Sequence, residues 1–520
     1  MNKSTIIRII LYSLLVLIVL FAYRHRIYGL ISKLVYDDSV AELTMEQKLS
    51  DFNDLYNTLS ESIPYFDEID SLYGIDFRDR HDYYESKIRE TTDNCEFYCT
   101  LQAISQDIPS FHTDICFPLY SNIRNIQCCG SDEVLDRFNM KGKIDSWYEI
   151  IGDTVRDYEN VNILWFEYLN GEYYVDERFL PESYEELSGY RLVTIDGTDA
   201  DEYIIQNISA FGMHYDHIND KAYRKAYVLN DSTGTEVSVV LESEDGSGCE
   251  ISLYVDAVAD VVANYGFLYD PDRSVSDVNN SIYMFRDDEH QLEYIEISNF
   301  TNNEGKQLAR YIEDSPYNTF VIDLRNNYGG TIEYAVKYLY PGLYMDDAVQ
   351  SYSWIVPDTD SNRAMTKDWV VLLNYGNNSS DGFYYYNETN TFKGESDKQN
   401  DIYYLVGTGT GSAADTYISM IKDNHLGTII GDTTGGEGLG FTYICNCLKE
   451  SSLIYVYYPS VSYDPATGEH ILGGTTPDIY VTPTLEEIHL QNEYIENGTD
   501  DEYEMRLQYD PALKWVIENM

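Results

Sequence analysis

Positive charge is scarce in this chain. Its 520 residues include 34 Lys and Arg against 89 Asp and Glu, a formal net charge of −55. Nucleic-acid binding needs clusters of Lys and Arg at the phosphates, so the composition argues against a nucleic-acid partner. Disordered chains are poor in aromatic residues, whereas this one has 51 tyrosines. The composition therefore indicates packed domains.

Spacings typical of metal sites are also missing. The sequence has no Cys-x-x-Cys pair and no His-Glu-x-x-His helix, so we predict no metal and no cofactor. His214 and His217 are three residues apart, which we interpret as a surface pair on a helix rather than a zinc site. The eight cysteines are even in number, which suits disulfides in an oxidising compartment.

The N-terminus, MNKSTIIRIILYSLLVLIVLFAYRHR, contains an uncharged run from Ile9 to Tyr23. The run is short for a membrane span, but Arg8 and Arg24 can snorkel and lengthen it. No small-x-small cleavage site follows, which favours an uncleaved signal anchor over a removed signal peptide or a buried core helix. We expect a single-pass cell-membrane protein with its large domain outside the cytoplasm, although basic flanks on both sides leave the positive-inside rule undecided.

The pattern of apolar residues then changes along the chain. LTMEQKLSDFNDLYNTLSESIPYF has helical spacing, TEVSVVLESEDGSGCEISLYVD reads as a β-hairpin, and later strands alternate with helices. Such alternation is typical of a layered α/β domain. We predict a signal anchor or transmembrane helix over 1–37, an N-terminal helical domain over 38–140, a β-rich domain over 141–275, a catalytic α/β core over 276–490, and a C-terminal tail or helix over 491–520.

One serine stands among small residues in GTGTGSAADTYISMIKDN. Ser412 follows a predicted strand and opens a predicted helix, a geometry that exposes a hydroxyl beside helix N–H groups. The N–H of Ala413 would be available to an oxyanion there. The spacing alone nevertheless favours a helix-capping serine over a nucleophile.

A second glycine motif, VIDLRNNYGG, ends an apolar strand. Asp323 and Arg325 close the strand, and Gly329 and Gly330 leave backbone N–H groups unshielded. Alone, this motif reads as a structural Asp–Arg pair followed by a glycine turn.

These two motifs, followed by GGTTPDIYV, resemble the tail-specific (C-terminal-processing) serine peptidase family. This family includes tricorn-like proteases and the repeats of interphotoreceptor retinoid-binding protein. EFYCTLQAISQDIPSFHTDICFP is similar to the histidine-bearing segment of the tricorn-like branch, and LSGYRLVTIDGTDADEYI resembles a PDZ-like segment. The resemblance implies a crotonase-like ββα-spiral core, a PDZ-like β-rich domain and a peptide or protein substrate.

Carried over by residue, the resemblance makes Ser412 the nucleophile. It assigns Gly329, Gly330 and Ala413 to oxyanion binding through their backbone. Members with a Ser-Lys dyad carry lysine in a loop that here reads GGEG, with Glu437 at the lysine position. A carboxylate with an ordinary pKa near 4 is a poor base at neutral pH, so that dyad is not available here.

A histidine base is the remaining option that the resemblance offers. His112 stands where the tricorn-like branch keeps its base, although Phe111 replaces the serine that precedes it there. Imidazole changes protonation near pH 6.5, which suits general-base work at neutral pH. The resemblance to a triad leaves either Glu437 or Glu469 to orient the ring.

The favoured hypothesis is a membrane-anchored serine peptidase that hydrolyses peptide bonds through an acyl-enzyme. The alternative is a catalytically inactive member that binds peptides or other ligands at the cell surface. A purely structural surface protein is the third possibility.

Overall fold

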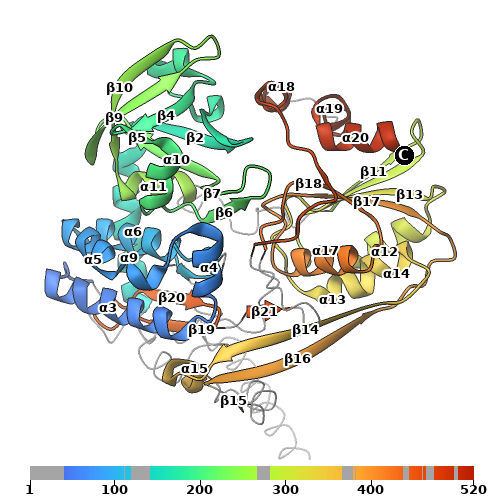
Figure 1. Ribbon diagram of the computed structural model, residues 1–520, viewed down its shortest axis with the longest axis horizontal. Coiled ribbons are helices and arrows are strands. Elements are labelled where there is room, and N and C mark those ends of the chain that lie inside the picture. Colours follow the sequence, from blue (N-terminus) through green and yellow to red (C-terminus); the bar gives the residue numbers. More distant parts are fainter. Residues whose placement is uncertain are drawn as a thin grey trace, which may run out of the picture.

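The computed structural model describes residues 40–110, 112–118, 141–265, 282–301, 303–365, 379–380, 382–436, 444–459, 461–463, 473–496 and 502–520. Figure 1 shows an N-terminal helical part below a β-rich part on one side, and an α/β part on the other. No helix within these ranges is long and apolar enough to span a membrane. The predicted anchor over 1–37 lies outside the described residues.

The N-terminal part is a helical cluster. Its elements are α3 (Met45–Ser62), α4 (Phe66–Tyr73), η1 (Phe77–Asp79), α5 (His81–Glu90) and α6 (Asn94–Ser105). Helix α3 begins in a capping box, in which Thr44 and Gln47 each accept a backbone N–H of the other. Helix α6 is capped by Asp93, whose carboxylate accepts the Glu96 N–H at 2.9 Å. The helical spacing read from the sequence around Met45–Ser62 is confirmed by α3.

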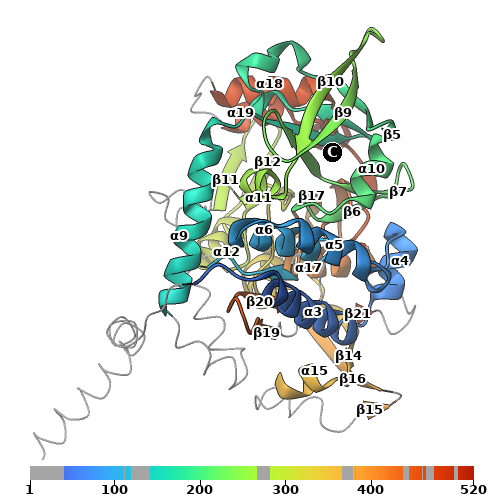
Figure 2. The same cartoon turned by 90° about the vertical axis from the view of Figure 1, so that its left-hand side faces the viewer.

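Two later helices complete this cluster. They are α9 (Lys141–Asp157) and α11 (Ala257–Tyr265). Both lie within the range 141–275 that was predicted to be β-rich. Trp147 of α9 is buried in the same core as α3 and α6, and Figure 2 shows α9 alongside these helices. The helical part is therefore built from segments on both sides of the β-rich sequence.

The β-rich part is one antiparallel sheet with strand order β3-β2-β8-β10-β9-β4-β5. An additional pairing of Tyr174 with Arg191 joins β3 to β4 and closes the sheet on itself. The predicted hairpin is confirmed, because β9 and β10 pair from Thr235–Val255 to Glu242–Gly248. The strands of this sheet are β2 (Ile163–Leu169), β3 (Glu172–Val175), β4 (Arg191–Ile195), β5 (Thr198–Asp199), β8 (Ala226–Asn230), β9 (Thr235–Glu242) and β10 (Gly248–Val255). The short helices in the same part are η2 (Tyr158–Asn160), η3 (Glu177–Phe179), η4 (Glu182–Leu187) and α10 (Ala200–Gln206). A separate hairpin is formed by β6 (Met213–Asp216) and β7 (Lys221–Arg224).

The α/β part is built on a six-stranded sheet of order β11-β12-β13-β17-β18-β22. All neighbours are parallel except β11 and β12. Its strands are β11 (Ile282–Asp287), β12 (Leu292–Ile297), β13 (Thr319–Asp323), β17 (Asp401–Val406), β18 (Thr428–Gly431) and β22 (Ile479–Tyr480). Because side chains alternate along a strand, both faces of this sheet are apolar and both are covered by helices.

One face packs on α12 (Gly305–Glu313), α13 (Ile332–Tyr334), η7 (Ala335–Leu339), α14 (Tyr340–Leu343) and α17 (Ala413–Asp423). The other face packs on the C-terminal helices α19 (Glu502–Tyr509) and α20 (Pro511–Asn519), which follow α18 (Leu485–Glu496). Leu513 and Val516 of α20 are fully buried. The segment that we expected to be an appended tail or helix is thus a covering layer of the sheet.

Two small sheets connect the parts. A long hairpin of β14 (Ala348–Pro357) and β16 (Phe383–Phe392), with β15 (Ser379–Ser380), β21 (Val461–Tyr463) and α15 (Asp360–Met365), projects at the base of the molecule (Figure 1). The other sheet joins β1 (Asp114–Ile115) to β20 (Ile454–Tyr457) and β19 (Ile444–Cys447). The segment after α6 is therefore paired with a strand from the C-terminal part of the sequence.

Candidate active site

Ser412 lies between the end of β17 and the start of α17. Its backbone has φ 52° and ψ −123°, and a residue with a Cβ at such a positive φ carries strain of order 1–3 kcal/mol. Ser412 occupies the N-cap position, but its side chain accepts no hydrogen bond from the first turn of α17. This geometry differs from the capping role that the spacing alone favoured.

The glycine turn after β13 packs directly against Ser412. Gly329 has φ 98°, and a Cβ built on it would lie 2.6 Å from the Ser412 Cβ and 2.9 Å from the Ala413 nitrogen. Real Cβ atoms essentially never come so close to other heavy atoms, so this position has no room for a side chain. Gly330, with φ 134°, is similarly crowded by the backbone of Phe300.

The loops around Ser412 are joined by backbone hydrogen bonds. The Ser412 N–H donates to the Gly436 carbonyl at 3.0 Å, and the Gly411 N–H donates to the Asn327 carbonyl at 3.0 Å. The Thr410 hydroxyl donates to the Leu324 carbonyl at 2.7 Å. The structure thus brings Ser412, Ala413 and Gly329 together through contacts between segments far apart in the chain.

The candidate oxyanion donors differ in their present partners. Ala413 is the first residue of α17, and no acceptor for its N–H is found among the described residues. The Gly329 N–H donates to the Asn327 Oδ1 at 2.9 Å. Asn327 is fully buried. The Asn327 side chain therefore holds one of the three candidate donors, and Asn327 was not identified from the sequence.

His112 lies on the loop between α6 and β1. Its ring centroid is 4.3 Å from that of Tyr458, and its backbone N–H donates to the Ser110 hydroxyl at 3.3 Å. Burial lowers the pKa of His112 to about 4. The ring is consequently neutral at physiological pH, and its pKa lies below the value of about 6.5 that the sequence suggested.

A cavity of about 590 Å³ separates the three parts of the molecule. Pro109 and Ser110 line it on the side of the His112 loop, and Gly409 and Gly435 line it beside the Ser412 loop. Its volume is in the range of small-molecule and peptide-side-chain pockets. The two candidate catalytic loops therefore border one cavity.

The β6 strand forms a third side of this cavity. His214 lies on β6 and lines the cavity, so the expected helical surface pair with His217 is wrong. The reason is that the segment pairs with β7 as a hairpin, with His214 opposite Tyr223. Burial lowers the pKa of His214 to about 3, so this ring too is neutral.

Two carboxylates near the candidate residues were missed by the sequence analysis. Asp415, in the first turn of α17, is fully buried and accepts the Thr475 hydroxyl at 2.8 Å and the Thr434 hydroxyl. It therefore ties α17 to the loops beside it. Asp114 lines the cavity two residues after His112, and burial raises its pKa to about 7. Only their proximity in sequence to Ser412 and His112 could have signalled them.

The remaining residues singled out in the sequence either have a structural role, as Asp323 and Arg325 do, or lie outside the described residues. Burial opposes ionisation of Asp323, but the nearby Arg325 outweighs it and lowers the pKa of Asp323 to about 2. Arg325 also binds Asp510 at 2.5 Å, which fixes the end of β13 to α20. This pair matches the interpretation of Asp323 and Arg325 as a structural pair.

Glu437 and Glu469 lie outside the described residues. The six described cysteines are free thiols rather than the expected disulfides.

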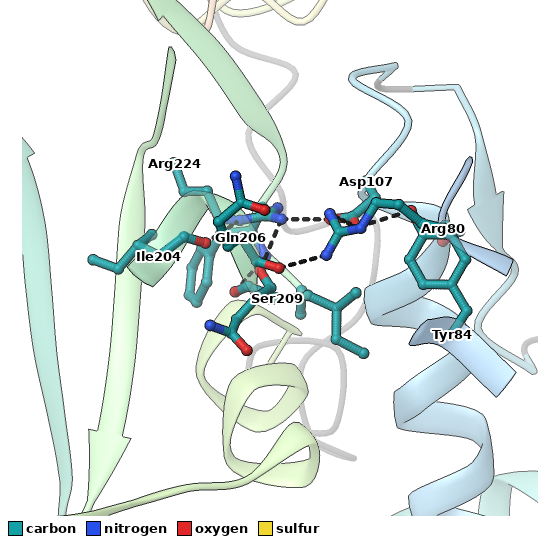
Figure 3. A network of polar contacts seen from close by, with 12 residues as sticks. Arg80, Tyr84, Asp107, Ile204, Gln206, Ser209 and Arg224 are labelled. Carbon is teal, nitrogen blue, oxygen red and sulfur yellow. Dashed lines mark hydrogen bonds and ion pairs between the residues drawn. The ribbon is translucent and has the colours of Figure 1, made fainter. Parts of the chain in front are cut away.

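A buried ion pair fixes the helical part to the β6–β7 hairpin beside the cavity. Figure 3 shows Arg224 of β7 reaching Asp107, on which Arg80 and Tyr84 also converge. Arg224 and Asp107 are both fully buried. Arg224 donates further to the carbonyl of Phe211 at 2.7 Å. One guanidinium therefore holds the start of the His112 loop and the segment that leads into β6.

Comparison with known proteins finds similarity to one class of enzyme. Residues 291–481 match the model of peptidase family S41, a family of serine-type peptidases. A carboxyl-terminal-processing protease from Synechocystis sp. is 26% identical over 149 residues, which is 28% of this chain and 28% of that protein. The match thus spans less than a third of the relative's length.

Solved structures of similar proteins extend over more of the chain. Mature CPAF complexed with lactacystin has 13% identity and a TM-score of 0.49, covering 92% of this chain and 99% of that one. The photosystem II D1 C-terminal processing protease has 15% identity and a TM-score of 0.35, covering 84% and 94%.

Proposed function

We propose that this protein is a serine peptidase that hydrolyses peptide bonds through an acyl-enzyme on Ser412. The observation that carries the proposal is the convergence of three groups. Ser412 has a strained backbone and does not cap its helix, Gly329 approaches it too closely for any side chain, and Ala413 begins α17. A nucleophile beside backbone N–H groups at a helix N-terminus is an arrangement that acyl transfer requires.

In the proposed reaction, the Ser412 Oγ attacks the carbonyl carbon of the scissile peptide bond. His112 accepts the hydroxyl proton and later gives it to the leaving amine, and water then hydrolyses the ester by the same route. The Ala413 N–H and the positive end of α17 stabilise the oxyanion. The Gly329 N–H joins them when Asn327 releases it. Gly330 supports this turn.

The proton acceptor is proposed to be His112 because its loop borders the same cavity as the Ser412 loop. Its lowered pKa of about 4 keeps the imidazole neutral, and only the neutral ring can accept a proton. Either Glu437 or Glu469 is proposed to orient this ring.

Three further features, which are the type of catalytic core, the role of the β-rich part and the membrane anchor, are proposed from the sequence. We assign a crotonase-like spiral to the α/β core and a PDZ-like role to the β-rich part, which would guide a peptide end to the cavity. We assign residues 1–37 to a membrane anchor that holds the peptidase outside the cytoplasm. A chain starting at Asp38 should then be released from membranes during fractionation, and equal retention of both forms would refute the anchor.

The activity is tested with a fluorophosphonate probe and with internally quenched peptides. Wild type is expected to react with the probe and to cleave peptides, and Ser412→Ala is expected to do neither. Thr410→Ser is a matched control, because it keeps the hydroxyl bond to Leu324 in the same loop. A folded wild type that neither reacts nor cleaves any peptide would support the binding-only alternative.

A further inference from the structure

Three aromatic rings gather on the wall of the cavity formed by the β-rich part. The ring centroids of Trp165 and Phe179 are 5.0 Å apart, and those of Trp165 and Phe211 are 5.0 Å apart in an edge-to-face arrangement. All three residues line the cavity. We call Trp165, Phe179 and Phe211 the aromatic wall.

The aromatic wall presents apolar surface where a soluble protein would normally bury it. Phe179 is 53% exposed, whereas Phe211 is 7% exposed and anchors the cluster from beneath. Large aromatic surface left open in a cavity marks a binding site more often than a packing defect. The same cavity continues to Gly409 and Gly435, which flank the Ser412 loop. A peptide bound at the wall can therefore extend within the same cavity to the loop that carries Ser412.

The wall is held in place by the buried ion pair of Figure 3. Arg224 donates to the Phe211 carbonyl at 2.7 Å and to the Asn207 carbonyl at 3.1 Å, and it binds Asp107 in the helical part. A fully buried guanidinium with these partners cannot shift without losing charged hydrogen bonds. Phe211 is thus positioned before any ligand arrives, which lowers the entropy cost of binding.

The charges beside the wall decide which side chain it accepts. Arg178 stacks near Phe179, but its guanidinium is already bound by Asp176 and Glu167. Glu167 and Asp114 also line the cavity. Arg178 is therefore already neutralised. Although Lys225 also lines the cavity, placing the carboxylate of an acidic side chain against three aromatic rings costs free energy that a Phe side chain does not.

We propose that the aromatic wall is a specificity subsite that binds one large aromatic side chain of the peptide substrate. This inference rests on the proposed function for its substrate class, but its binding step does not require catalysis. In an apolar pocket, a change in side-chain size alters selectivity by about 10- to 200-fold. We expect peptides with Phe at this position to bind about tenfold more tightly than those with Ala, and those with Glu to bind most weakly.

The test uses the full chain carrying Ser412→Ala, so that bound peptides are not cleaved. Fluorescein-labelled octapeptides of Ala, Ser and Gly, each with a single Phe, Ala or Glu at one scanned position, are titrated by fluorescence anisotropy. The Phe preference is expected in this background and should fall to less than about threefold when Phe179→Ala is added. The matched control is Met345→Ala, since Met345 is 54% exposed and does not line the cavity.

The outcomes separate the inference from the proposed function. A Phe preference that is lost with Phe179→Ala and kept with Met345→Ala supports the aromatic wall, even if wild type cleaves no peptide. Equal affinity for the Phe and Ala peptides, or a preference that Phe179→Ala leaves intact, would overturn the inference, even if wild type is an active peptidase. Trp165→Leu provides a second variant, which keeps an apolar side chain at the wall and should reduce the preference to an intermediate value.

Discussion

Gly329→Ala tests the geometry of the candidate active site with a single methyl group. The new Cβ would lie 2.6 Å from the Ser412 Cβ, 2.8 Å from the Gly411 carbonyl oxygen and 2.9 Å from the Ala413 nitrogen. All three neighbours belong to the backbone or to the first side-chain atom, so none can move away independently. The turn or the start of α17 must shift, and both carry the groups proposed to bind the oxyanion.

The expected effect on rate follows from the loss of that alignment. Removing one oxyanion donor lowers kcat by about 10²–10³-fold, and we expect Gly329→Ala to reach at least this range. The positive φ at this position should also lower the free energy of unfolding by about 1–2 kcal/mol. Steady-state hydrolysis of a quenched peptide measures the rate, and urea unfolding measures the stability.

Gly246→Ala is the matched control for the conformational cost. Gly246 has φ 82°, and nothing lies within 4 Å of a Cβ built on it. This variant should lose similar conformational stability and keep its activity. If Gly329→Ala is folded and hydrolyses peptides within about threefold of wild type, then Gly329 is not part of the oxyanion site and our reasoning from the close approach fails.

The remaining predictions concern the base and the buried ion pair. His112→Ala should lower kcat by about 10²–10⁴-fold; folded protein with near-normal turnover would remove His112 from the mechanism. In wild type, kcat/KM should rise with pH through a midpoint near 4, because burial lowers the pKa of His112 to about 4 and the neutral ring exists only above it; a midpoint near 6.5 would contradict this environment. Arg224→Met should lower the free energy of unfolding by up to about 3–5 kcal/mol, because the buried Asp107 loses one of its two cationic partners and keeps only Arg80 and Tyr84. Adding Asp107→Leu should restore part of that loss in a double-mutant cycle, and strictly additive losses would show that the two residues do not interact.

Local patterns in the sequence predicted much of the fold. Apolar spacing in 45–62 predicted α3, alternation in 235–255 predicted the β9–β10 hairpin, and the apolar run before Asp323 predicted β13. Each depends on residues near one another in the chain. The positions of Ser412 at the start of a helix and of Gly329 in a turn were predicted for the same reason.

Contacts between distant segments could not be predicted in this way. Asp107 and Arg224 are 117 residues apart in sequence, and each alone reads as an ordinary surface charge. The pairing of Asp114 with Val456 likewise depends on how the parts assemble. Burial that results from this assembly also lowers the pKa of His112, and no composition or spacing could indicate that shift. The α20 layer was missed because its apolar residues follow an acidic stretch that resembles a surface tail.

The central claim, that Ser412 is the acylated nucleophile, is tested most directly by locating the label. The full chain is treated with a fluorophosphonate probe and digested, and the modified residue is identified by tandem mass spectrometry. We predict a single phosphonylated site at Ser412, formed at a rate that falls strongly in His112→Ala. A stable adduct on another residue, or none at Ser412 in folded protein that cleaves peptides, would contradict the account.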